Sequence, residues 1–140
     1  VETNAVDWLQ KSFGDFAELS ESVQSVTLKN AAHGDEVLEY IVSQRDKLLE
    51  LRKLDLEGSV VSDAAVRQLS VFRRLAELNL NRTPITWQSL HVVEWLPELD
   101  TVHVEGTGLK WLTRQRLAAR LRRKRKAAAT LRAVHPTAVR

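Results

Sequence analysis

The chain has 140 residues, enough for a single domain, and 44% of them are hydrophobic but only 6% aromatic, so aliphatic side chains must supply most of its core. It has no Cys, which excludes disulfides, thiolate metal sites and Cys nucleophiles and fits an intracellular protein. Its formal net charge of +3 hides a sharp division: the segment 110–140 contains more than half of the Lys and Arg residues and no Asp or Glu. A cationic tail on an acidic body predicts contact with an acidic or polyanionic partner.

The N-terminal segment, residues 1–22, is predicted to be a helical cap. Its apolar residues recur at helical spacing, and Asn4 followed by Asp7 suits the start of a helix. We expect it to cover the first of the repeated units that follow, because an end unit otherwise leaves an apolar side bare. The chain begins at Val1 without an initiator Met, as a processed chain or a fragment of a longer protein would.

Residues 23–109 repeat one frame of apolar positions four times. In each unit an apolar residue lies three places before a central apolar residue and another lies two places after it, with a polar residue between these last two. This alternation predicts a short strand with its apolar side chains inward. Successive strands are far enough apart for a right-handed crossover through a helix, and hence for parallel pairing. The central residues, whose spacing is nearly constant and identical for the last three, are Val26, Leu54, Leu78 and Val102.

The connections between these strands are predicted to be helices. Apolar residues recur at helical spacing at equivalent places in two successive connections. Ser62 and Thr86 stand where helix N-caps belong, and Pro97 would end the second helix. The apolar positions are Val66, Leu69 and Phe72 in one connection and Leu90, Val93 and Leu96 in the next.

This frame resembles the leucine-rich repeat family, whose units run about 20–29 residues with the pattern L-x-x-L-x-L-x-x-N/C-x-L. Where the family places Asn or Cys, this chain has Ala31, Ser59, Thr83 and Thr107. A hydroxyl can satisfy the turn backbone as the family residue does and Ala31 cannot, so the first unit is degenerate. The resemblance implies an α/β leucine-rich-repeat solenoid of about four repeats, with helical caps at both ends, and protein binding as the usual function.

No enzyme or metal motif is found in the sequence. It lacks a Gly-rich phosphate loop, H-E-x-x-H, G-x-S-x-G and an EF-hand loop. The best catalytic-looking pair is His103 with Glu105 on the fourth strand, but a single His without converging ligands indicates an ordinary polar sheet face. We therefore expect a non-enzymatic protein without a cofactor, a metal or a small-molecule substrate.

The polar residues of the four strands are expected to point outward together from the concave face of the sheet. Solenoids present such extended surfaces to protein partners, and the alternative is a solvated face without a partner. The predicted protein-binding residues are Arg52, Asp55, Glu57, Glu77, Asn79, Asn81, His103 and Glu105.

Two tryptophans repeat in the frame. Trp87 and Trp111 occupy the same position in successive units, so their side chains should be neighbours at the entry to the helices. Either they stack on each other as part of the core, or they form an exposed aromatic edge that binds protein, since Trp is enriched in contact hot spots.

Residues 110–140 are predicted to form a basic C-terminal capping helix and tail. The stretch 110–133 has no Gly or Pro and is rich in good helix formers. Leu112, Leu117 and Leu121 should pack on the last repeat, and the residues from about position 120 onward should be free for contact. The predicted anion- or RNA-binding residues are Arg120, Arg122, Arg123, Lys124, Arg125 and Lys126.

Several functions are compatible with this tail. We expect a scaffold or assembly subunit of a larger complex whose basic helix contacts an acidic protein. The alternative is a subunit of a ribonucleoprotein particle whose tail binds RNA phosphates without reading sequence. A nuclear import signal, a membrane-surface helix and a solvated helix without a partner are further interpretations. No apolar run approaches the roughly 20 residues of a membrane span, and the sequence does not resolve a cytoplasmic, nuclear or organellar location.

Overall fold

The structure is a computed structural model that describes residues 24–134, with side chains as far as Leu131. The N-terminal cap predicted for residues 1–22 lies outside the described residues, as does the end of the tail at 135–140. The described part holds nearly all of the repeat region and most of the basic segment.

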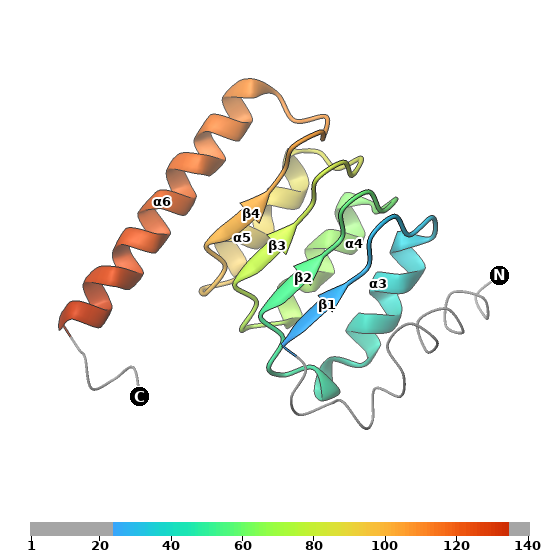
Figure 1. Cartoon of the computed structure of the whole chain (residues 1–140), viewed down its shortest axis with the longest axis horizontal. Helices are drawn as coiled ribbons and strands as arrows, with labels where there is room; N and C mark the ends of the chain where they lie inside the picture. The colour runs from blue at the N-terminus through green and yellow to red at the C-terminus, as the bar shows by residue number, and fades with distance from the viewer. Residues whose placement is uncertain (1–23, 135–140) are drawn as a thin grey trace.

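Four short strands form one parallel sheet in chain order (Figure 1). The central residues of the sequence frame are paired across it: Val26 with Leu54, Leu54 with Leu78, and Leu78 with Val102. This register is well specified, because a shift of one residue would turn each buried side chain outward. The strands are β1 (Ser25–Thr27), β2 (Lys53–Asp55), β3 (Glu77–Asn79) and β4 (Thr101–His103).

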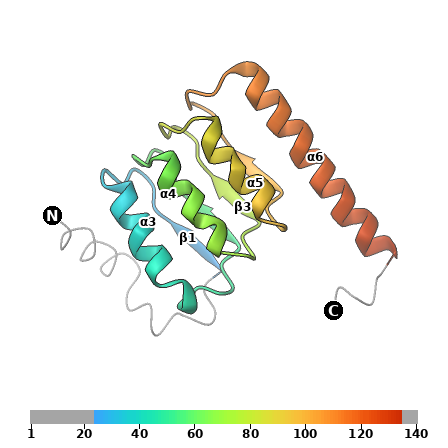
Figure 2. The same cartoon turned by 180° about the vertical axis from the view of Figure 1, so that it is seen from behind.

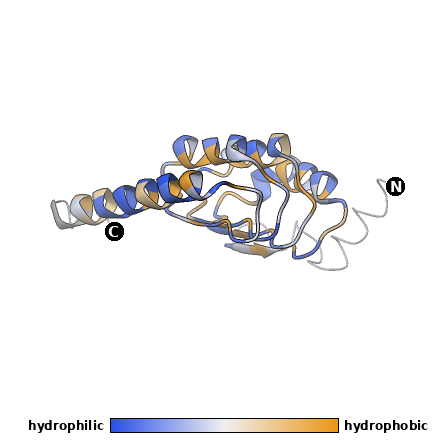
Figure 3. Cartoon of the chain, turned by 90° about the horizontal axis from the view of Figure 1, so that it is seen from above, coloured by the Kyte–Doolittle hydropathy of each residue, from blue (hydrophilic) through white to orange (hydrophobic). Residues whose placement is uncertain are grey.

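A layer of helices covers one face of this sheet (Figures 2 and 3). As predicted, the Ser62 hydroxyl caps its connection by accepting a hydrogen bond from Ala65 N at 3.2 Å, and the Thr86 hydroxyl accepts one from Gln88 N at 3.3 Å. Two of the connections combine a short α-helical segment with a short 3-10 segment. The helical segments are α3 (Gly34–Ser43), η1 (Arg45–Lys47), α4 (Asp63–Arg67), η2 (Gln68–Val71), η3 (Trp87–Leu90) and α5 (His91–Trp95).

The core lies between the two layers and, among the described residues, is aliphatic apart from Phe72. Leu54 and Leu78 point into it from the strands, and Leu69 and Leu96 meet them from the helical layer; all four are fully buried. Each unit therefore covers the apolar side of its neighbour, which is the packing that the repeated frame predicts.

Hydroxyls satisfy backbone groups in the turns after β1, β3 and β4. The Ser59 hydroxyl donates to the carbonyl of Leu28 and accepts from Ala31 N at 3.0 Å, so it serves the first unit, whose own position is occupied by Ala31. Thr83 and Thr107 donate to the carbonyl three residues earlier in their own units, at 2.7 and 2.8 Å. Ser59 of the second unit thus supplies the hydroxyl that the first unit lacks at Ala31.

The basic segment forms one long helix, α6 (Trp111–Val134), which runs back alongside β4 and α5 and extends past the helical layer (Figures 1 and 3). Leu117 and Leu121 are buried against the last unit as predicted, but Leu112 is 50% exposed. The prediction for Leu112 was wrong because a residue five places before Leu117 lies about 140° away around the helix. Only the face that carries Leu117 and Leu121 seals the repeats.

Candidate functional site

The outward face of the sheet brings several of the predicted residues together as ion pairs. Glu77 Oε2 lies 3.5 Å from the Lys53 ammonium and 3.6 Å from Nε2 of the His103 imidazole. Arg52 faces Glu98 at 3.9 Å. These charges largely compensate one another within the sheet face.

Glu57 is held on the same face by two neighbours from the next unit. Asn79 Nδ2 donates to its Oε1 at 3.2 Å, and Arg82 Nη2 lies 2.7 Å from its Oε2. The hydrogen bond from Asn79, followed by that from Arg82, holds the pKa of Glu57 below its ordinary value. Glu57 is therefore ionised and already paired at neutral pH.

Three of the predicted side chains accept hydrogen bonds from backbone N–H groups instead of extending into solvent without a partner. Asp55 Oδ1 accepts from Glu57 N at 3.0 Å, and Asn79 Oδ1 accepts from Asn81 N at the same distance. Asn81 Oδ1 reaches the next unit and accepts from Glu105 N at 2.7 Å. Asp and Asn readily form such turns at strand ends. Asp55 is nevertheless buried, and its Oδ2 lies 3.7 Å from Lys29 Nζ.

The described residues of this face offer few free groups. Of the eight predicted contact residues, His103 and Glu105 are exposed, while most others are half-buried. No group of three His, Cys, Asp or Glu side chains within residues 24–134 is placed to hold a metal ion. Across the same residues, no helix combines the length and apolar character of a membrane span.

An Asp at the start of a helix ties each of the first two units to the next. Asp35 Oδ1 accepts from Ser62 N at 2.7 Å, and Asp63 Oδ1 accepts from Thr86 N at 2.9 Å. Asp63 also accepts from the hydroxyls of Thr86 and Ser89. Burial raises the pKa of Asp63, but these hydrogen bonds together outweigh it and leave the pKa below its ordinary value.

Trp87 and Trp111 occupy this same frame position in the last two units. They are 59% and 66% exposed, and the described aromatic rings include no contact between them, so of the two alternatives the stacked core pair is not the one observed. The Trp87 ring instead turns along its own helix and meets His91 edge to face at 5.7 Å, and His91 stacks on Trp95 at 5.7 Å. Residues four apart on a helix are neighbours, which explains this choice.

Three of the six predicted anion-binding residues hold α6 on the body. Arg120 Nη1 pairs with Glu94 Oε1 at 2.9 Å, and Arg125 Nη1 donates to the carbonyl of Asp100 at 2.7 Å. Lys124 Nζ donates to the carbonyls of Val93 at 2.6 Å and Leu96 at 2.8 Å.

Lys124 therefore caps the C-terminal end of α5, where carbonyls lack a partner within the helix and a cation is favoured. Burial lowers the pKa of Lys124. The expectation that every cation from position 120 onward is free for contact was wrong. Lys124 lies seven residues after Leu117 and three after Leu121, so helical periodicity already places it on their face.

The other three residues of the predicted set are exposed. The side chains of Arg122, Arg123 and Lys126 make no ion pair or hydrogen bond within the described part of the chain. The basic segment is thus divided between docked and exposed cations.

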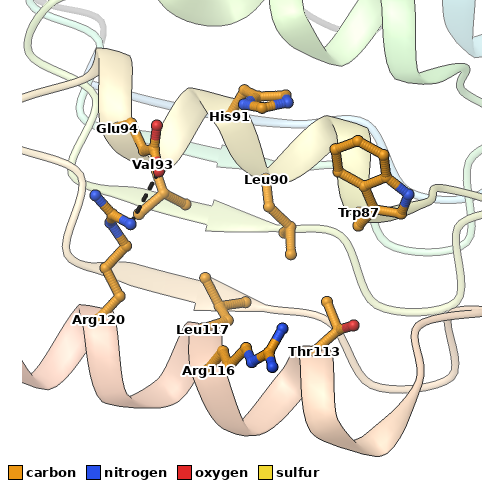
Figure 4. Close-up of a pocket in the computed structure, with 9 residues that line it drawn as sticks. All are labelled: Trp87, Leu90, His91, Val93, Glu94, Thr113, Arg116, Leu117 and Arg120. Carbon is orange, nitrogen blue, oxygen red and sulfur yellow. Dashed lines mark ion pairs between the residues drawn. The ribbon is translucent and has the colours of Figure 1, made fainter.

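A groove of about 210 Å³ separates α5 from α6 (Figure 4). Leu90 and Leu117 point toward one another across it. Trp87 lies at one end and the Arg120–Glu94 ion pair at the other. The groove was not predicted, because it depends on the angle at which α6 leaves the body.

Comparisons with known proteins agree on the fold. No protein-family model and no curated protein matches the chain. Leiomodin-1 actin-binding site 2 matches with a TM-score of 0.60 at 11% identity, covering 91% of this chain and 97% of that one. The tropomodulin C-terminal domain of Caenorhabditis elegans matches with a TM-score of 0.54 at 13% identity, covering 94% and 98%. The Mex67:Mtr2 subunits of Chaetomium match with a TM-score of 0.51 at 22% identity, covering 87% and 79%. These likenesses support a leucine-rich-repeat-like α/β fold.

Proposed function

We propose that this chain is a non-enzymatic protein-interaction module, a scaffold or assembly subunit, whose helix α6 binds an acidic surface of a protein partner. The supporting observation is that the cations of the basic segment fall into two groups. Arg120, Lys124 and Arg125 hold α6 on the last unit, while Arg122, Arg123 and Lys126 are exposed on the same helix. The docked cations give the exposed ones a fixed position on the surface.

Electrostatics within α6 favour an external counter-charge. The segment 110–134 contains no Asp or Glu, and Arg122 and Lys126 lie four residues apart on the helix. Like charges at this spacing destabilise a helix by roughly 0.2–0.5 kcal/mol per pair. Carboxylates of a partner would remove this repulsion and would steer association from a distance.

The remaining surfaces fit an interaction module better than an enzyme. The sheet face is internally paired, with His103 and Glu105 at its exposed margin, and Trp87 and Trp111 form an exposed aromatic edge. Leiomodin-1 is matched over a region named as an actin-binding site, and Mex67:Mtr2 is a pair of subunits. By analogy of fold, we propose the same general role here, with residues 23–109 as a solenoid, 1–22 as its N-terminal cap and 110–140 as its basic capping helix.

The second candidate is a ribonucleoprotein subunit, which the same exposed cations favour. Arg122, Arg123 and Lys126, called here the exposed ridge of α6, can bind RNA phosphates. This binding would weaken steeply with salt, with a log–log slope of roughly one per phosphate contact. Protein and RNA partners are therefore separable by nuclease treatment and by salt titration.

The test compares two matched double charge reversals in capture experiments with lysate of the source organism, each run with and without nuclease treatment. Arg122→Glu/Arg123→Glu alters the exposed ridge, and Arg45→Glu/Lys47→Glu alters two exposed cations on η1. We expect the wild-type and the η1 variant to retain the same protein partner and the α6 variant to lose it. Loss of capture on nuclease treatment alone would favour the RNA candidate, and capture unchanged in the α6 variant would refute the role of α6.

A further inference from the structure

The position of Trp87 marks the last two units as different from the others. In the first two units this frame position is an Asp whose carboxylate binds the helix start of the next unit. In the third unit Trp87 occupies this position, so an indole that is 59% exposed replaces the carboxylate and its hydrogen bond to the next unit. A large exposed aromatic side chain in place of a structural carboxylate indicates a contact function.

The groove beside Trp87 has an aliphatic floor. Leu90, Val93 and Leu117 line it between the two helices, and Trp87 and His91 form one wall. Figure 4 shows the floor side chains converging from α5 and α6, with the indole at the end of the groove. Its volume of about 210 Å³ and its position between helices suit a single apolar side chain.

The rim of the groove is cationic. Glu94 is neutralised by Arg120 at 2.9 Å, whereas Arg116 on the same rim makes no ion pair with the described residues. Arg116, Arg120 and Arg123 follow one another at helical spacings of four and three residues, on one side of α6.

The groove continues into two further hollows along α6. One is lined by Arg120, Arg123 and Ala127, and the next by Arg123, Ala127 and Leu131. From Thr113 to Leu131 this surface is about 27 Å long, a length that an extended segment of about eight residues spans. An apolar socket at one end thus opens onto a row of cations.

We propose that the groove between α5 and α6 seats one apolar side chain of an acidic partner segment, which then runs along α6 over Arg116 and Arg123. This inference rests on the proposed function and specifies the chemistry of the partner. An apolar anchor matches the aliphatic floor, and flanking carboxylates match the cations that the body does not neutralise.

The experiment uses two labelled synthetic peptides of about ten residues, both rich in Glu, which differ only in a central Phe that is Ala in the second peptide. Fluorescence anisotropy gives their dissociation constants with the full chain. Because the Phe side chain would be buried in the groove, we expect the Phe peptide to bind roughly tenfold more tightly. The Trp87→Ala variant should bring this ratio close to one.

The control variant is Leu49→Ala, which removes an exposed apolar side chain outside the groove. It should keep the tenfold ratio. The Arg122→Glu/Arg123→Glu variant should weaken both peptides alike and leave the ratio intact, which separates the anchor from the charged ridge.

Equal binding of the two peptides by the wild-type chain would overturn the inference, as would a ratio that Trp87→Ala leaves unchanged or a failure of both peptides to bind. Peptide binding that depends on Arg122 and Arg123 but not on the Phe would sustain the proposed function without the anchor. A uridine oligonucleotide that binds more tightly than either peptide, and loses binding in Trp87→Ala, would assign the groove to a stacked base instead.

Discussion

Ser59 links two units through one buried hydroxyl, which donates to the Leu28 carbonyl and accepts from Ala31 N. We expect Ser59→Ala to lower the free energy of unfolding by about 1–3 kcal/mol, because the buried Leu28 carbonyl and the half-buried Ala31 N–H lose their partner. Urea unfolding followed by circular dichroism measures this. Ser25→Ala, at an exposed strand position, should change stability by less than about 0.5 kcal/mol. Equal effects of the two substitutions would contradict the role of Ser59.

Asp63 makes stability depend on pH. Its pKa is lowered in the folded chain, because hydrogen bonds from Thr86 and Ser89 outweigh the opposing effect of burial. A carboxylate of this kind stabilises the fold above its unfolded pKa of about 3.9, and the contribution is lost as pH falls through the lower folded value.

We therefore expect Asp63→Asn to cost about 1 kcal/mol near neutral pH and to flatten the fall in unfolding free energy between about pH 5 and pH 2. Urea unfolding at a series of pH values measures the slope. Glu39→Gln removes a carboxylate from an exposed position on α3 and should keep the wild-type slope. An unchanged slope in Asp63→Asn would show that its hydrogen bonds do not couple to folding.

Individual residues also show what the sequence could predict. Ser62 and Thr86 were correctly predicted as caps, because capping depends on a local offset within one unit. The frame likewise placed Trp87 and Trp111 at equivalent positions. Equivalent positions, however, do not predict the direction in which each side chain points. The Trp87 ring follows its own helix to His91.

At the scale of elements, α6 depends on Lys124. The ammonium binds the carbonyls of Val93 and Leu96 at the end of α5. We expect Lys124→Ala to raise the exchange rates of amides in residues 118–131 by about tenfold or more, since a hydrogen bond to a charged group contributes about 1.5–3 kcal/mol. Hydrogen–deuterium exchange with mass spectrometry measures this. Arg122→Ala, on the exposed face, should leave the rates unchanged, and equal rates in the two variants would show that Lys124 does not hold the helix.

The elements of the fold were largely predictable, and their docking was not. Strand register follows from a frame that recurs at a constant interval around Leu54, Leu78 and Val102. In the sequence, by contrast, every cation of the basic segment looks equally available for contact with a partner, because charge alone does not distinguish a docked Lys124 from an exposed Arg123. Only the spacing from Leu117 carried that information.

At the scale of the molecule, the units should unfold together. Leu78 is fully buried at the centre of the sheet and pairs with both neighbouring strands. We expect Leu78→Ala to cost about 2–5 kcal/mol and to destabilise all four strands in one transition. Urea unfolding with residue-resolved hydrogen exchange tests this, and Val60→Ala, at an exposed position, is the control. Separate transitions for β1 and β4 would contradict a shared core.

Charge is also distributed at this scale. The acidic body and the cationic helix touch through Arg120 with Glu94, yet Arg122, Arg123 and Lys126 are left exposed. The molecule therefore uses Arg120 for its own cohesion and leaves these three cations of α6 exposed. An acidic partner would balance these exposed charges, which is the role proposed for α6.

The most direct test of this role for α6 is the affinity of the captured protein partner for three chains: the wild-type, Arg122→Glu/Arg123→Glu and Arg45→Glu/Lys47→Glu. Their thermal midpoints are recorded in parallel. We predict that reversal on α6 weakens binding at least about tenfold, or about 1.4 kcal/mol, with little change in thermal midpoint, and that reversal on η1 changes neither quantity. Equal affinities for all three chains, or equal losses in both variants, would contradict the assignment of partner binding to the exposed cations of α6.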